Sequence, residues 1–273
     1  MLTRSDVRNC DVLAGLMDVT DESIDLVVAD PPYGIAKDFG LPDSYADIQG
    51  WRVWCREWLT ECKRVLRPTG NLIVYGIHHH LCYTQVDLYG LGMKYRRQII
   101  WHYDNGFCGN RFMRATYEPL LWFSKSDRFH FEEIREPYKS AERLQYTITK
   151  RGKVWTPNPA GRVAGDIWSF PTLAGRRFRD EKVDHPTQKP LSISERIVRH
   201  FCPEGGNVLV PFAGSGSECV AAYRLRRTFV GFELNPDYVL LAKRRLRAEG
   251  WPKERSDPAA SLGEEVSQVA MDV

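Results

Sequence analysis

The chain has 273 residues, of which 43% are hydrophobic and 12% aromatic, which is typical of one globular domain with or without an insert. Its net charge is only +3, so the total charge does not by itself indicate a nucleic-acid partner. Seven scattered cysteines, with no C-x-x-C pair, predict a reduced cytosolic protein without a zinc knuckle. We expect neither a secretory signal nor a membrane span, because no apolar stretch is long enough for either.

The first predicted strand is the apolar run 24–29. Residues 7–25 lead into it and include a short helical pattern around 11–17. Asp30-Pro31-Pro32-Tyr33 follows this strand, and its two prolines fix a rigid turn. The turn therefore lies at the carboxyl end of a strand, the edge at which open α/β sheets bind ligands.

This turn combines groups that suit the amino group of a flat base. The Asp30 carboxylate and the Pro31 carbonyl can each accept one N–H, and the Tyr33 ring offers a stacking face. Two acceptors favour a pyramidal amino nitrogen whose lone pair is exposed. The alternative is a Pro-rich turn in which the Asp is a local cap and the Tyr is packing.

Residues 51–66 have apolar side chains at helical spacing, so their tryptophans are expected in the core rather than in a base-stacking ladder. Residues 67–70 are expected to stop this helix, and 71–76 to form the next strand. The strand–helix–strand order predicts a parallel sheet. The histidines at 78–80 are read as a loop, because consecutive residues cannot all face one ion and no spaced partner is present; no metal is expected.

Two further strands, possible antiparallel neighbours, are predicted at 95–101 and 119–123. The connection 105–117 carries Arg111 and Arg114 and is either a loop over a ligand or merely an exposed one.

Between residues 143 and 180 periodicity fades and the charge becomes strongly positive. Eight Lys or Arg residues stand against Asp166 and Asp180 only, and Tyr146, Trp155, Trp168 and Phe178 lie among them. Cations interleaved with aromatics suit a phosphate backbone with unstacked bases, and a solvated basic loop is the alternative.

Regular patterns return in the last third of the chain. A helix is predicted at 191–201, a strand that starts at 207 and runs into a glycine turn ending at 216, a helix at 217–225, a strand at 228–232 and a final helix from 235 to about 248, followed by a loose tail at 253–273.

The strand that starts at 207 runs into a glycine turn, Gly214-Ser215-Gly216, and Glu233 ends the next strand. The glycines permit close approach of a ligand to the backbone, and the carboxylate can accept from both hydroxyls of a ribose. The turn lacks a P-loop Lys-Ser/Thr, and Cys219 replaces the third glycine of a dinucleotide fingerprint. A nucleoside without pyrophosphate, such as S-adenosylmethionine, therefore fits better than NAD or a triphosphate.

Four motifs together resemble the β class of the DNA amino-methyltransferases, including its restriction-modification members. They occur in the family's order and are Asp30-Pro31-Pro32-Tyr33-Gly34, His185-Pro186-Thr187-Gln188-Lys189-Pro190, Phe212-Ala213-Gly214-Ser215-Gly216 and Phe232-Glu233-Leu234-Asn235. Tyr117-Glu118-Pro119 and residues 157–162 also look like the family's middle region. The resemblance covers residues from about 7 to 248.

The resemblance implies an α/β fold: a circularly permuted Rossmann-like, S-adenosylmethionine-dependent methyltransferase fold with a mostly parallel sheet. Residues 1–107 and 185–250 would form the catalytic core, 108–184 an inserted target-recognition segment and 251–273 a flexible tail. The chain would act on double-stranded DNA in the cytoplasm, associated with the nucleoid, and a homodimer is possible.

Three groups of site residues follow from the motifs and the resemblance. The catalytic group is Asp30, Pro31, Pro32 and Tyr33. The cofactor-binding group is Asp11, Asp30, Thr187, Lys189, Phe212, Ala213, Gly214, Ser215, Gly216 and Glu233, with Asp11 near the adenine and Thr187 and Lys189 near the methionine part. The DNA-binding group is Arg111, Arg114, Lys150, Arg151, Lys153, Arg162, Arg176, Arg177 and Arg179.

The expected reaction is methylation of adenine N6 in a base flipped out of the duplex and stacked on Tyr33. Asp at the first motif position resembles the adenine enzymes, and N4 of cytosine is the alternative. Cytosine-C5 methylation is excluded, since it typically needs a Cys after Pro and none of the sixteen prolines precedes a Cys. An RNA methyltransferase or a catalytically silent DNA-binding protein is less favoured.

Overall fold

The computed structural model describes residues 5–32, 48–76, 80–106, 111 and 113–251. Tyr33, Gly34, His78, His79 and the tail at 253–273, all subjects of the predictions above, lie outside the described residues.

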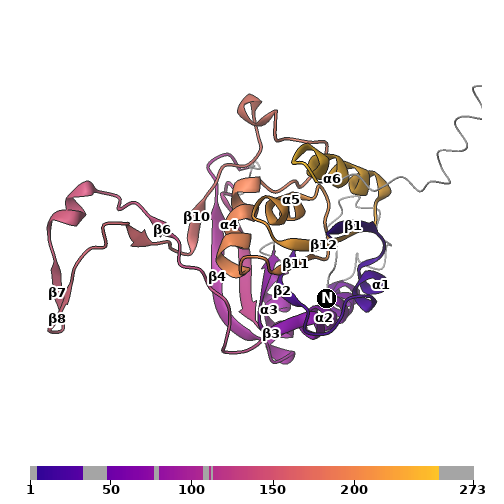
Figure 1. Ribbon diagram of the computed structural model, residues 1–273, viewed down its shortest axis with the longest axis horizontal. Helices are drawn as coiled ribbons and strands as arrows, with labels where there is room; N and C mark the ends of the chain where they lie inside the picture. The colour runs from indigo at the N-terminus through magenta and orange to yellow at the C-terminus, as the bar shows by residue number, and fades with distance from the viewer. Residues whose placement is uncertain (1–4, 33–47, 77–79, 107–110, 112, 252–273) are drawn as a thin grey trace, which may run out of the picture.

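An eight-stranded sheet with the order β1-β12-β11-β2-β3-β5-β4-β10 forms the centre of the molecule (Figure 1). Its strands are β1 (Asp6–Asn9), β2 (Ile24–Ala29), β3 (Leu66–Tyr75), β4 (Lys94–His102), β5 (Tyr117–Ser124), β10 (Ile167–Ser169), β11 (Asn207–Val210) and β12 (Thr228–Glu233). Only β5 runs antiparallel to its neighbours, β3 and β4. The prediction of an α/β fold with a mostly parallel sheet is confirmed.

Helices cover both faces of this sheet (Figure 1). They are α1 (Val12–Met17), α2 (Ile48–Val65), α3 (Leu81–Gly90), α4 (Leu191–Phe201), α5 (Ser217–Arg224) and α6 (Pro236–Ala248). The buried side chains of α1, α2 and α3 belong to the core on one face, and those of α4, α5 and α6 to the core on the other. Along β2, Leu26 and Val28 point to one core and Val27 and Ala29 to the other, as strand alternation requires.

Helix ends follow local sequence chemistry. The Asp11 side chain accepts from the backbone N–H of Leu13 at 2.8 Å and so caps α1. The Asn235 side chain caps α6 in the same way, and Pro236 occupies its first turn. In α2, the predicted stripe of Trp51, Trp54 and Trp58 is buried, which confirms its place in the core.

Elements β1, α3 and β3 differ from the predictions. The chain enters the sheet earlier than expected, at β1, whose four residues include one apolar side chain, Val7, and which pairs only with β12. Helix α3 was not predicted. Residues 67–70, predicted to lie between the helix and the next strand, belong to β3, which begins at Leu66. A register shift against β2 accommodates Pro68 inside β3.

Residues 125–166 leave the sheet and carry short elements of their own: β6 (Arg135–Glu136), β7 (Ile148–Lys150), β8 (Lys153–Trp155), β9 (Arg162–Val163) and the 3₁₀ turn η2 (Ala141–Gln145). A second 3₁₀ turn, η3 (Arg176–Phe178), follows β10. Within the predicted recognition segment 108–184, β5 and β10 pair with the central sheet. The DNA-binding role and the boundaries of this segment stay a prediction.

Candidate functional site

A pocket opens at the carboxyl ends of four parallel strands. Its lining includes Cys10 and Asp11 after β1, Asp30 to Pro32 after β2, Pro211 to Ser215 after β11, and Glu233 and Leu234 at β12. The adjacent strands β11 and β2 send their following helices, α5 and α2, to opposite faces of the sheet. This divergence is the topological switch point at which α/β sheets bind ligands.

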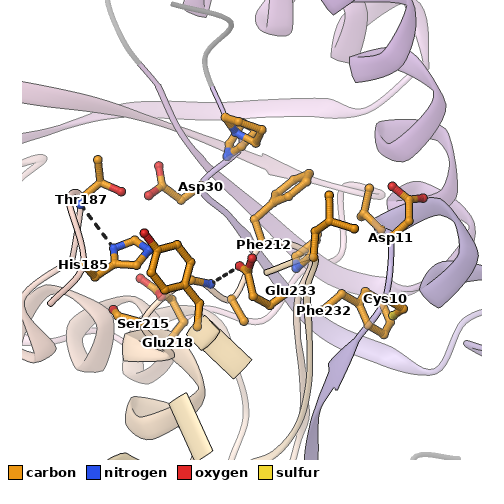
Figure 2. Close-up of a pocket in the computed structure, with 18 of the residues that line it drawn as sticks. Cys10, Asp11, Asp30, His185, Thr187, Phe212, Ser215, Glu218, Phe232 and Glu233 are labelled. Atoms are coloured by element: carbon orange, nitrogen blue, oxygen red, sulfur yellow. Dashed lines mark hydrogen bonds between the residues drawn. The ribbon is translucent and has the colours of Figure 1, made fainter. Parts of the chain in front are cut away.

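The two loops that the sequence places almost two hundred positions apart meet in this pocket. Asp30, Pro31 and Pro32 line it together with Phe212, Gly214 and Ser215. Figure 2 shows Asp30, Phe212 and Ser215 around the pocket. The two loops therefore share one pocket. Tyr33 lies outside the described residues, so its position stays a prediction.

Of the ten predicted cofactor-binding residues, all but Gly216 line the pocket. Gly216 instead precedes α5 with φ +78°, and a Cβ there would lie 2.7 Å from the Cβ of Ala242. A glycine is therefore required at this position, because the glycine turn approaches α6 closely there. Gly216 helps to position the turn but does not line the pocket.

Backbone N–H groups of Gly214 and Asn235 hold the carboxylate of Glu233. Gly214 has φ +47°, and its N–H donates to Oε2 of Glu233 at 2.8 Å, while the N–H of Asn235 donates to Oε1 at 2.8 Å. Burial raises the pKa of Glu233, and these backbone hydrogen bonds oppose the rise. The carboxylate is thereby fixed beside the glycine turn, with further lone pairs able to accept from a ligand.

His185 lies against the glycine turn. Its ring lies 4.5 Å from the ring of Tyr238, and its Nδ1 accepts from the N–H of Thr187 at 3.3 Å (Figure 2). Burial lowers the pKa of His185 to about 4, so the ring is neutral at pH 7. A Cβ on Gly214 would lie 2.9 Å from its Nε2, so only glycine fits there.

Lys189 lies between two carboxylates. Its ammonium is 2.8 Å from Oδ2 of Asp30 and 3.3 Å from Oε2 of Glu118, and it lies 5.0 Å from the centre of the Tyr75 ring. Burial lowers the pKa of Lys189, but the charges of Asp30 and Glu118 raise it by more. This ion pair fixes the carboxylate of the Asp-Pro-Pro turn.

Trp51 holds the same turn from the other side. Its indole Nε1 donates to the carbonyl of Pro32 at 2.8 Å, which ties the turn to α2. The Phe212 ring is fixed similarly, at 5.5 Å from Trp54 and 5.2 Å from Trp58. The tryptophans of α2 are therefore both core residues and supports of the pocket.

The pocket is rich in carboxylates. Asp11, Asp30, Glu218 and Glu233 line it, whereas its single lysine is already paired and His185 is neutral. Burial, and next the charge of Asp30, raise the pKa of Glu218. Such a lining disfavours phosphates and suits a cationic nucleoside.

The sequence reasoning missed several lining residues: Cys10, Val12, Trp54, His185, Pro211, Glu218, Phe232, Leu234 and Tyr238. Trp54 and Tyr238 gave no sign, since helical spacing indicates only packing. Glu218 could have been found, because it lies in the first turn of the helix that directly follows the glycine turn.

The predicted DNA-binding residues differ in their contacts. Arg162 pairs with Glu136 at 3.3 Å, Arg177 lies over the ring of Phe178, and Arg114 donates to the carbonyl of Asp104 at 3.4 Å. Arg111, Lys150, Arg151, Lys153, Arg176 and Arg179 are exposed.

Trp168 corrects one prediction. It is 2% exposed and packs against the Arg196 guanidinium and Phe201, so it is a core residue and is not available to unstacked bases.

In the described part of the chain, no group of His, Cys, Asp or Glu side chains is arranged to hold a metal ion. None of its helices combines the length and the apolar character that crossing a membrane requires.

Comparison with known proteins identifies the family. The profile of the DNA methylase family (N6/N4 methyltransferases) matches residues 24–244. The type II methyltransferase M.BglII of Bacillus subtilis is 33% identical over 254 residues, 89% of this chain and 69% of that protein. The DNA adenine methyltransferase YhdJ of Escherichia coli (strain K12) is 32% identical over 246 residues, 86% of this chain and 80% of that protein.

Solved structures share the fold. PvuII DNA methyltransferase, which is cytosine-N4-specific, aligns with a TM-score of 0.67 at 15% identity over 96% of this chain and 92% of its own. The M1.HpyAVI–SAM complex aligns with a TM-score of 0.60 at 23% identity, covering 88% of this chain and 98% of its own. With the family profile spanning both the Asp-Pro-Pro turn and the glycine turn, this chain belongs to the N6/N4 DNA methylase family.

Proposed function

We propose that the chain transfers a methyl group from S-adenosylmethionine to the exocyclic N6 of adenine in duplex DNA, as the methyltransferase of a restriction-modification system. The observation that carries this proposal is the single pocket lined by both Asp30-Pro31-Pro32 and the glycine turn. The names of M.BglII, a type II methyltransferase, and of YhdJ, a DNA adenine methyltransferase, support the substrate and the setting.

The donor set fits the cofactor. S-adenosylmethionine is a phosphate-free nucleoside with a positive sulfur, and when bound it supplies an activated methyl group. Glu233 would accept from its ribose hydroxyls, with Phe212, Ala213, Gly214 and Ser215 against the nucleoside, Asp11 near the adenine, and Thr187 and Lys189 toward the methionine part. Carboxylates around a paired lysine favour this cation over NAD.

The Asp-Pro-Pro turn would hold the target amine. The Asp30 carboxylate and the Pro31 carbonyl each accept one amino hydrogen, which exposes the nitrogen lone pair, and Tyr33 is expected to stack on the flipped base. Lys189 fixes Asp30, and Trp51 engages the carbonyl of Pro32, so the acceptors are oriented before the base arrives. Positioning of this kind supplies most of the catalytic effect, because no covalent intermediate is needed.

Asp30→Asn tests this assignment. The amide keeps the shape of the side chain but replaces one acceptor oxygen with a donor, so turnover should fall by about 10²–10³-fold. Methyl transfer is measured with tritiated S-adenosylmethionine and cofactor affinity by calorimetry, and the affinity should fall by much less than the turnover. Glu233→Gln is the matched control, for which cofactor affinity should fall instead. Near-normal turnover of Asp30→Asn would refute the assignment.

Cytosine N4 is the second candidate, because the same two acceptors fit either amine and PvuII DNA methyltransferase shares the fold. Mass spectrometry of nucleosides from methylated DNA separates N6-methyladenine from N4-methylcytosine. Competition between duplex DNA and RNA tests the RNA alternative, and complete absence of transfer would favour a silent DNA-binding protein.

A further inference from the structure

The guanidinium of Arg245, on α6, reaches the start of the neighbouring helix α5. These two helices pack side by side on one face of the central sheet (Figure 1). Nη1 of Arg245 donates to the backbone carbonyl of Ser215 at 2.7 Å and to the hydroxyl of Ser217 at 3.0 Å. It also lies 3.2 Å from the hydroxyl of Ser215. One nitrogen of α6 therefore holds both the glycine turn and the first residue of α5.

These contacts differ from those of an ordinary salt bridge. In the described part of the chain, the hydrogen bonds of Arg245 all go to uncharged oxygens, and its buried Nη2 has no hydrogen-bond partner. Burial lowers the pKa of Arg245, and the charges of Glu218 and Glu181 oppose this effect. A buried guanidinium with one unpartnered nitrogen contributes little to the free energy of unfolding. The positions that Arg245 gives to the two serines are therefore its main effect.

The hydroxyl of Ser217 extends these contacts toward the Asp-Pro-Pro turn. Ser217 is 1% exposed, and it accepts from Arg245 while it donates to the backbone carbonyl of Lys189 at 2.7 Å. The ammonium of the same lysine lies 2.8 Å from Oδ2 of Asp30. A continuous series of contacts thus runs from α6 through Ser217 and Lys189 to the proposed acceptor of the target amine.

This series joins the two loops from outside the pocket. Ser215 and Asp30 line the pocket, whereas Arg245 and Ser217 do not. Methyl transfer needs the donor and the amine in line at close range, and a displacement of about 1 Å can lower such a rate by about 10²-fold. A residue that holds both loops can therefore influence the rate without touching the cofactor or the base.

We propose that Arg245 is a positioning residue for methyl transfer, which acts through Ser217 and Lys189 to place Asp30 relative to the glycine turn. This inference rests on the proposed function. It implies two separable effects. Through Ser215, Arg245 affects the affinity for S-adenosylmethionine, and through Ser217 it affects the rate at saturating cofactor.

Arg245→Met tests this inference in the full chain, because methionine keeps much of the length of the side chain and removes all its donors. Tritiated S-adenosylmethionine and plasmid DNA without adenine methylation give kcat and KM, and calorimetry gives the affinity for the cofactor. The affinity and kcat should each fall about tenfold, whereas the melting temperature should stay near that of the wild type. Arg245→Lys, which keeps a cationic donor, should recover part of both losses. Arg244→Met, at an exposed position of the same helix, should behave like the wild type.

Ser217→Ala tests the route to Asp30. Removal of the hydroxyl should lower kcat about as much as Arg245→Met does and should lower the cofactor affinity less. If Arg245 acts through Ser217, the double variant should have a kcat no lower than that of the slower single variant. Multiplied effects on kcat would overturn the proposal, as would an unchanged kcat in Arg245→Met. Unfolding of Arg245→Met would overturn it too, because Arg245 would then be a structural residue.

Crystal structures provide a readout that does not depend on activity. With the central sheets superposed, the carboxylate of Asp30 in Arg245→Met should be displaced relative to the glycine turn, and unchanged positions would overturn the proposal. If the wild type transfers no methyl group to DNA, the proposed function itself fails. The crystal structures and the cofactor affinity then decide whether Arg245 positions the two loops.

Discussion

The ammonium of Lys189 shows how individual charges organise the pocket. It is 6% exposed and would be costly to bury alone, but Asp30 and Glu118 lie within 3.3 Å of it. Glu118 lies on β5, the antiparallel strand, so this strand contributes to the site although none of its residues lines the pocket. The pair fixes Asp30, the residue on which the proposed chemistry depends.

Gly214 is a position where a single methyl group should be damaging. Gly214→Ala would place a Cβ 2.9 Å from Nε2 of His185 and a side chain at φ +47°. We expect a loss of about 1–3 kcal/mol in the free energy of unfolding, together with weaker binding of S-adenosylmethionine. Urea unfolding and calorimetry measure the two effects.

Gly165→Ala is the control for this substitution, since a Cβ there meets nothing within 4 Å. Adding His185→Ala to Gly214→Ala should restore part of the lost stability, because it removes the clash. Equal effects of the two glycine substitutions would show that His185 is not the obstacle.

His185 should make stability depend on pH. Burial lowers its pKa to about 4 from the ordinary 6.5. A depressed pKa in the folded state means that the contribution is complete above pH 6.5 and is lost as the pH falls toward 4. His185→Phe keeps a ring against Tyr238 and removes the titration. Its melting temperature should therefore fall less than that of the wild type between about pH 7 and pH 5, as measured by scanning calorimetry. Parallel pH profiles would contradict this.

At the scale of elements, α2 supports both the core and the site. Its apolar stripe packs under the sheet, and the first tryptophan of that stripe also donates to the Asp-Pro-Pro turn. The helix therefore couples the packing of one face to the position of the proposed amine acceptors.

Trp51→Phe separates these two roles. The substitution keeps an aromatic ring but removes the hydrogen bond to Pro32. The rate of methyl transfer should therefore fall, whereas the loss of stability should match that of the control. Trp101→Phe is the matched control, because Trp101 is equally buried and donates to the carbonyl of Phe170 at 2.8 Å, outside the pocket lining. Each variant should lose about 0.5–1.5 kcal/mol of stability in urea unfolding. Only Trp51→Phe should reduce the rate of methyl transfer, and equal rates would refute the role given to the turn.

At the scale of the whole molecule, the central sheet and the β7–β8 hairpin differ in how they are stabilised. The sheet is covered by helices on both faces, whereas the hairpin exposes all its strand residues. Replacing residues 147–156 by a short Gly-Ser turn should therefore leave the melting temperature and the affinity for S-adenosylmethionine nearly unchanged. Calorimetry measures both. Loss of folding in this variant would show that the β7–β8 hairpin stabilises the central sheet.

Much of the fold could be predicted from local patterns. The helix at Leu191–Phe201 appears with the predicted bounds, and the predicted strand begins at Asn207 and ends at Val210. Both could be predicted because a helical apolar period and a continuous apolar run are local properties. The short strand β1 was missed because one apolar residue in four gives no period. Helix α3 was missed although it also buries an apolar side, which includes Leu81 and Leu88.

The motifs of the sequence by themselves determined the family and two loops of the site. These are the Asp-Pro-Pro turn after one strand, which supplies hydrogen-bond acceptors, and the glycine turn after another. Only the tertiary structure decided that these loops share one pocket, that Glu118 and Lys189 fix Asp30, that Trp51 holds Pro32, and that Trp168 is buried. The reason is physical. Strand and turn preferences depend on neighbouring residues, whereas sheet order and side-chain pairing depend on contacts between residues far apart in the chain.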